Sequence, residues 1–145
     1  MQTGNEVLDV ILTEKNLLCR EAKIQLLCMA DGTGLDFIKP HHLYALLSNA
    51  LENAVEAVRD LPEDERFIHL YIRHQGNLCH IQVENAYQGT VALRNGVPVT
   101  HKADQNYHGF GILSMKTIAE SYDGEMIVTA EDGIFCLDVL LTAPA

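Results

Sequence analysis

The chain has 145 residues, enough to bury a core of its own, and its 48% hydrophobic and 21% charged residues are ordinary for one globular domain over residues 1–145. Its formal net charge of −10 argues against a nucleic-acid partner. No apolar run reaches the length of a membrane span and no signal peptide is visible, so we expect a cytoplasmic domain with no direct membrane contact.

Apolar spacing and turn residues predict the first four elements. Residues 6–18 have the apolar spacing of a short helix, and residues 23–30 have the composition of a strand followed by a turn over 31–34. A long helix is expected over residues 40–60, because Pro40 suits the first helical turn and Leu61-Pro62 would end the helix.

Alternating apolar residues predict two strands over residues 66–74 and 78–86, joined by a tight turn at Gly76-Asn77. The apolar residues of the next segment, residues 87–108, show no sustained helical or strand period, and the segment includes Gly89, Gly96 and Pro98. Long irregular segments inside a domain are usually functional, so we expect a lid here.

The last third of the chain predicts a helix over residues 109–122, ended by Asp123-Gly124, and a second hairpin. Its strands are expected over residues 125–130 and 134–141, with the turn at Asp132-Gly133. This order of elements predicts an α+β two-layer sandwich in which helices cover one face of a sheet.

The long helix carries two carboxamides, Asn49 and Asn53, one turn apart. At about 100° per residue, both lie just beyond one edge of the apolar face, with Glu52 and Glu56 further round toward water. A side-chain oxygen at that edge is well placed to reach a ligand or a metal at the lip of a cleft. The apolar face is expected to consist of Leu43, Leu46, Leu47, Ala50, Leu51, Ala54 and Val58.

The segment His108-Gly109-Phe110-Gly111-Ile112-Leu113 lies where the expected lid meets a helix. Glycines let backbone N–H groups approach a ligand, and a helix N-terminus adds free donors, which together favour a phosphate site. Neither a dinucleotide fingerprint nor a P-loop is present in the sequence. Asn85, at the end of a predicted strand, is either a base-edge contact or a turn residue.

Residues 87–118 contain one acid, Asp104, and three bases, a local charge of +2 that suits a small polyanion, although a chance fluctuation explains it equally well. The four cysteines, Cys19, Cys28, Cys79 and Cys136, lie far apart without metal-binding spacing, so we expect buried, reduced thiols.

The order of the expected elements resembles that of the GHKL ATP-binding domains. These domains have an asparagine-bearing helix, a polar residue that ends a strand, a lid, and a G-x-G that opens a helix. That superfamily covers histidine kinases, gyrase B, Hsp90-type chaperones and MutL. Three stretches resemble the peptide-pheromone (quorum-sensing) and citrate-type sensor kinases: Thr3-Gly4-Asn5 with Val7-Leu8-Asp9, residues 49–57, and Thr100-His101-Lys102 leading to His108-Gly109-Phe110-Gly111. The resemblance implies the Bergerat ATP-binding fold, with a mixed, mostly antiparallel sheet covered on one face by about three helices.

The resemblance also implies roles for individual residues toward ATP and Mg²⁺. Asn53 would be the Mg²⁺ ligand and Asn49 a polar contact to the nucleotide, where the hydrolysing branches have a glutamate that activates water. Asn85 would receive the adenine amino group. Gly109 and Gly111 would let the lid hinge and close over the phosphates, Ile112 would be a further nucleotide-binding residue, and Lys102 with His108 would meet the phosphate charge. Asn49, Lys102 and His108 are therefore the catalytic candidates.

The chain departs from the family pattern at three places. The usual D-x-G-x-G motif is replaced by Asn85-Ala86-Tyr87-Gln88-Gly89. The amide of Asn85 gives up a charge-assisted hydrogen bond, which costs on the order of 1 kcal/mol, or roughly fivefold in nucleotide affinity. His101 replaces a serine and Ile112 a leucine, and both changes are mild.

We expect a catalytic module that aims the γ-phosphate of ATP at a histidine on a helical domain outside this chain, with a response regulator downstream. Only about forty residues precede the asparagine-bearing helix, too few for that helical hairpin together with the first helix and strand. Two alternatives stay open: a stand-alone GHKL serine kinase of the anti-sigma-factor kind, and a degenerate, non-catalytic nucleotide-binding or interaction module.

Overall fold

The computed structural model describes residues 2–89, 93–94, 97–98 and 105–144, and residues 93–94, 97–98 and 105–110 by their backbone alone. The elements are α1 (Glu6–Glu21), β1 (Gln25–Ala30), α2 (Pro40–Val58), the short 3₁₀ helix η1 (Glu63–Glu65), β2 (Phe67–Gln75), β3 (Leu78–Ala86), β4 (Leu93–Arg94), β5 (Val97–Pro98), α3 (Gln105–Ser121), β6 (Glu125–Glu131) and β7 (Ile134–Thr142). The described strands form a five-stranded sheet of order β1-β2-β3-β7-β6 and a small β4-β5 pair.

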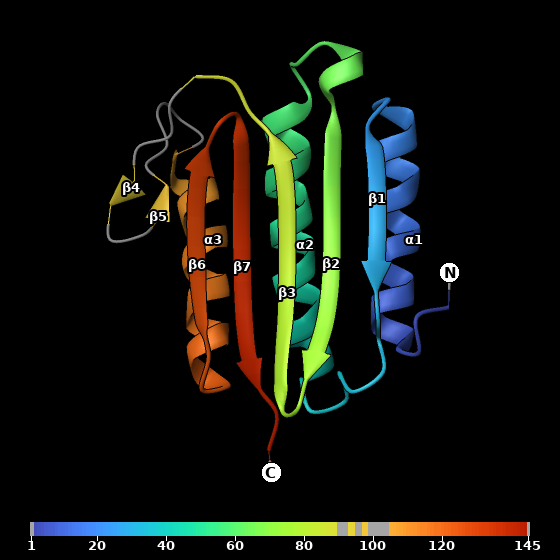
Figure 1. Cartoon of the computed structure of the whole chain (residues 1–145), viewed down its shortest axis with the longest axis vertical. Coiled ribbons are helices and arrows are strands. Elements are labelled where there is room, and N and C mark those ends of the chain that lie inside the picture. Colours follow the sequence, from blue (N-terminus) through green and yellow to red (C-terminus); the bar gives the residue numbers. More distant parts are fainter. Residues whose placement is uncertain (1, 90–92, 95–96, 99–104, 145) are drawn as a thin grey trace.

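The expected α+β two-layer sandwich is confirmed. β1 lies parallel to β2, whereas the other neighbouring strands of the large sheet are antiparallel. The helices α1, α2 and α3 lie side by side on one face of this sheet, and the other face is open (Figure 1). Among the described residues, no helix is both long and apolar enough to cross a bilayer.

Alternation along the strands separates the two faces of the sheet. On β2, β3 and β7 every second side chain is buried against the helices, and the intervening ones face away from them. The hairpin turns lie where expected: Gly76 has φ +61°, and Asp132 and Gly133 have φ +53° and +77°. Two successive positive φ angles are typical of the type I′ turn, whose twist matches that of the strands. The buried residues of these three strands are Ile68, Leu70, Ile72, Cys79, Ile81, Val83, Asn85, Phe135, Leu137, Val139 and Leu141.

The structure differs from expectation between residues 87 and 108, where an irregular lid was predicted. β4 pairs with β5, and α3 begins at Gln105, four residues before the expected Gly109. Both differences have a signal in the sequence. Asn95-Gly96 is a preferred hairpin dipeptide, and Asp104 is a residue type favoured immediately before a helix. Glycine was taken as a helix boundary, but it also occurs inside helices at a cost of about 1 kcal/mol relative to alanine.

The Thr3-Gly4-Asn5 segment caps α1 and joins it to the loop after β1. The side-chain oxygen of Asn5 accepts from the Leu8 N–H at 3.0 Å, and both the backbone N–H and the hydroxyl of Thr3 donate to Asp9, at 2.8 and 2.7 Å. These hydrogen bonds from Thr3 lower the pKa of Asp9. The Gly32 N–H donates to the Thr3 carbonyl at 2.9 Å. The segment therefore fixes where the chain enters the helical layer.

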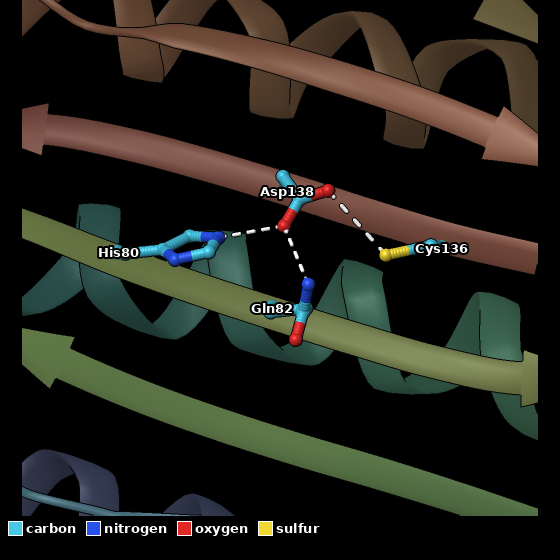
Figure 2. Close-up of polar contacts among 4 residues, drawn as sticks. All are labelled: His80, Gln82, Cys136 and Asp138. Carbon is cyan, nitrogen blue, oxygen red and sulfur yellow. Dashed lines mark hydrogen bonds and ion pairs between the residues drawn. The ribbon is translucent and has the colours of Figure 1, made fainter.

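A polar cluster centred on Asp138 lies on the open face of the sheet (Figure 2). One oxygen of Asp138 accepts from Gln82 at 2.9 Å and lies 2.6 Å from Nε2 of His80, and the other accepts from the Cys136 thiol at 3.4 Å. Cys136 is thus half-buried beside a carboxylate, whereas a buried thiol was expected. Cys28 is also half-buried, whereas Cys19 and Cys79 are buried. Among the described residues all four thiols are free.

Ser48 is an isolated defect in the buried face of α2. Its residue is 7% exposed, and its hydroxyl oxygen has no hydrogen-bond partner within the part of the chain that the structure describes. A buried hydroxyl without a partner has lost its water without compensation.

Replacing Ser48 by alanine is expected to stabilise the fold. Ser48→Ala removes the unpaired hydroxyl and raises helix propensity, so the free energy of unfolding in urea should increase by about 1 kcal/mol. Ser114→Ala, on the exposed side of α3, is the matched control and should gain only the propensity part, about 0.5 kcal/mol. An equal gain in both variants would show that the Ser48 hydroxyl is satisfied.

Cys136 is expected to resist alkylation in the native protein. Burial, and then the charge of Asp138, raise the pKa of its thiol from 9.0 to about 12. The reactive thiolate at pH 8 is therefore about a thousandfold scarcer than for an ordinary thiol. The rate of labelling with iodoacetamide can be followed by peptide mass spectrometry. The Cys136 thiol should be labelled faster in Asp138→Asn than in the native chain, and at the native rate in Glu125→Gln. Equal rates in the first variant and the native chain would exclude the effect of Asp138.

Candidate functional site

Helix α2 presents its two amides as its sequence predicts. Leu43, Leu46, Leu47, Ala50, Leu51, Ala54 and Val58 are all at most 3% exposed and hold the helix on the sheet. Asn49 and Asn53 are half-buried at the edge of this face. Both amides therefore stand at the margin between the core and solvent.

A cleft between α2 and α3 brings four of the predicted residues together. Asn49 and Asn53 line it from α2, and Gly111 and Ile112 line it from α3. Its enclosed volume is about 30 Å³, enough for a water molecule or a small ion. Pockets for small molecules are typically about 300 Å³ or more. The described residues therefore enclose space for a small ion or a water molecule, and not a complete nucleotide pocket.

Three further residues line this cleft that the sequence analysis did not assign to a site. Glu52 and Glu56 come from α2 and Met115 from α3. The two glutamates were expected further round, toward water. They lie three and seven positions after Asn49, which is the spacing of one helical face, so a search for neighbours at this spacing would have found them.

Gly111 allows α3 to lie against α2. A Cβ atom built at Gly111 would be 3.4 Å from the side-chain oxygen of Asn49 and 3.7 Å from its amide carbon. A methyl group at this position would thus be in van der Waals contact with Asn49, which leaves little room for a side chain that extends beyond Cβ. In this structure Gly111 is inside the helix, and its visible role is close helix packing.

The early start of α3 corrects the predicted phosphate site. The free N–H groups of a helix are those of its first turn, which here begins at Gln105. Gly109 and Gly111 were expected to supply these donors, but they lie one turn further along, where N–H groups bond within the helix. The donors of this helix end therefore belong to residues 105–108.

The remaining predicted site residues do not meet in the cleft. Asn85 is 1% exposed on the helix-covered face of β3, and its side-chain nitrogen donates to the Ala86 carbonyl at 2.8 Å. It is the second-to-last residue of β3. His108 is placed only by its backbone in α3, and Lys102 lies outside the described residues, as do Thr100 and His101.

The charged side chains that line the cleft, within the described part of the chain, are the two glutamates Glu52 and Glu56, and Lys15 contacts the first of them from outside the cleft. Nζ of Lys15, on α1, lies 3.1 Å from a carboxylate oxygen of Glu52. The Lys15 side chain is 10% exposed and that of Glu52 is 43% exposed. No group of three His, Cys, Asp or Glu side chains in the described part of the chain is arranged to hold a metal ion. The cleft would therefore hold a cation only if other groups supplied most of the ligands.

Comparison with known proteins identifies the family to which this fold belongs. The sequence profile of the GHKL domain matches residues 38–142, which is most of the chain. This chain belongs to the GHKL domain family, whose ATP-binding fold accounts for the sheet and the helices on one face.

The structural neighbours include histidine kinases. The catalytic domain of histidine kinase ThkA, in a nucleotide-free form, superposes with a TM-score of 0.72 at 15% identity, covering 97% of this chain and 92% of that chain. A second nucleotide-free form of the same domain gives 0.70 at 16% identity and covers 98% and 96%. Histidine kinase AdeS of Acinetobacter baumannii gives 0.67 at 10% identity. This chain is covered to 96% and spans 64% of the AdeS chain. No curated protein sequence matches.

Proposed function

We propose that this chain binds Mg²⁺–ATP as the catalytic module of a sensor histidine kinase. The supporting observation is that Asn49 and Asn53 face Gly111 of α3 across one cleft. Asn49 has an amide side chain, which cannot act as the general base that activates water for ATP hydrolysis. This favours transfer of the phosphate to a protein over simple hydrolysis.

The donor set of the cleft suits Mg²⁺. This hard cation takes oxygen ligands, keeps several waters and is commonly held by one or two protein groups together with phosphates. Asn53 is our candidate ligand, and the lack of a complete metal cage among the described residues fits a cation that arrives with a nucleotide. When bound, Mg²⁺ would neutralise phosphate charge.

The residues of this chain would act mainly by positioning the nucleotide. Asn49 would hold the triphosphate beside α2, and Asn85 would pair with the adenine edge through its side-chain oxygen, since its nitrogen donates to Ala86. Gly109 and Gly111 would let the lid hinge over the phosphates, and Ile112, which lines the cleft with Gly111, would contact the nucleotide. Lys102 and His108 remain proposed contacts to the phosphates. Holding the phosphate in line with its acceptor supplies most of the catalysis in such reactions.

The proposed acceptor is a histidine on a separate helical domain of the same kinase, with a response regulator downstream. We place the chain in the quorum-sensing or citrate-sensor branch, because Thr3-Gly4-Asn5 and the segments around Asn53 and Gly111 resemble it. The working location would be the cytosolic side of a membrane-bound sensor. A degenerate, non-catalytic module is the second candidate, favoured by the small volume of the cleft and the burial of Asn85.

Magnesium and nucleotide together are expected to raise the melting temperature. A ligand at a hundred times its dissociation constant adds about 2.7 kcal/mol of stability. With a non-hydrolysable ATP analogue, Asn53→Ala should lose the Mg²⁺-dependent part of this gain and keep the part seen in EDTA. Asn16→Ala, on α1 away from the cleft, is the control and should respond like the native chain. Equal Mg²⁺ responses of Asn53→Ala and the control would refute the metal assignment, and no response from the native chain would favour the degenerate module.

Phosphate transfer should distinguish a histidine kinase from a serine kinase. Mixed with ATP, Mg²⁺ and a supplied helical hairpin carrying an acceptor histidine, the chain should yield an acid-labile phosphoprotein. A serine-containing anti-sigma partner offered in its place should stay unlabelled. An acid-stable label on the serine protein would overturn the proposal in favour of the anti-sigma-factor kind of kinase.

A further inference from the structure

The ion pair between α1 and α2 joins the cleft to a part of the fold outside it. Lys15 lies on the buried side of α1, among Leu8, Ile11, Leu12 and Cys19, and is 8% exposed as a residue. Its Nζ lies 3.1 Å from Glu52, whose side chain is 43% exposed. The other lysine ion pair of the described residues, Lys23 with Glu63, is exposed on both sides, at 68% and 61%.

Burying a lysine between two helices costs desolvation free energy. An ammonium group taken out of water is costly, and the attraction of its partner often only balances that cost. An apolar side chain at position 15 would pack among the same neighbours without this cost. The position therefore points to a role beyond stability.

The partner of Lys15 forms part of the cleft wall. Glu52 lines the cleft beside Asn53 and lies one turn from Glu56, so two carboxylates border the space proposed for the phosphates. A triphosphate entering there would be repelled by both charges. Lys15 contacts Glu52 from the α1 side, where its positive charge offsets one of them.

We propose that Lys15 is a positioning residue for nucleotide binding, acting through Glu52. It draws the Glu52 carboxylate toward α1, away from the amide of Asn53, and reduces the negative charge that the cleft presents to the phosphates. This inference rests on the proposed binding of Mg²⁺–ATP. It adds that the first helix of the chain sets the affinity of a site to which it contributes no direct contact.

The test is a double-mutant cycle on Lys15 and Glu52. Lys15→Met keeps a long apolar side chain in the core and leaves Glu52 able to reach solvent, so the fold should persist, as a thermal melt would verify. The affinity for the Mg²⁺ complex of a non-hydrolysable ATP analogue, measured by calorimetry, should fall by about tenfold, because one carboxylate at the phosphates is no longer offset. Adding Glu52→Gln to Lys15→Met should restore most of this loss. Lys23→Met, which breaks the exposed pair, is the matched control and should bind like the native chain.

Each outcome decides a different point. If the native chain does not bind the analogue, the proposed function fails and this inference fails with it. If the native chain binds and Lys15→Met binds equally well, only the inference fails. If Lys15→Met binds weakly and Glu52→Gln does not restore binding, the loss comes from packing at α1, and a charge role for Lys15 is excluded.

Discussion

The contact between Gly111 and Asn49 is the interaction on which the candidate site depends. Without a side chain at Gly111, α3 lies against the amide of Asn49, with 3.4 Å between a virtual Cβ and the amide oxygen. The cleft exists because two helices that pack on the same sheet approach this closely beside Asn53. The same approach of the two helices keeps the volume of the cleft small, at about 30 Å³.

The buried face of the sheet holds α2 in place, and the edge of this helix with Asn49 and Asn53 lines the cleft. Apolar residues of β2, β3 and β7 cover the inner face, and Asn85 is the one polar residue among the buried side chains of the described strands. The open face carries the cluster around Asp138 and takes no part in the cleft (Figure 2). The fold thus places both the packed core and the candidate cleft on the helical side of the sheet.

Local patterns predicted the fold well where they were periodic or capped. The amphipathic spacing of α2, the two hairpins with Gly76 and Gly133 at their turns, and the strand alternation agree with the structure within a few residues. The start of α3 was predicted wrongly, because Gly109 was weighted as a boundary above the capping residue type at Asp104. Cys136 was misjudged because hydrophobic neighbours in sequence do not reveal which face of a strand a side chain occupies, nor that Asp138 lies beside it.

The sequence by itself determined the order of elements, the apolar faces and the pair of amides on α2, since these follow from spacing along one helix or strand. Its resemblance to the GHKL domains also pointed to the family that the profile match established. Only the tertiary structure decided that Lys15 of α1 reaches Glu52 of α2, and that Gly111 of α3 lies beside Asn49. These contacts join residues between 37 and 62 positions apart, and no local periodicity encodes how two helices approach each other on a shared sheet.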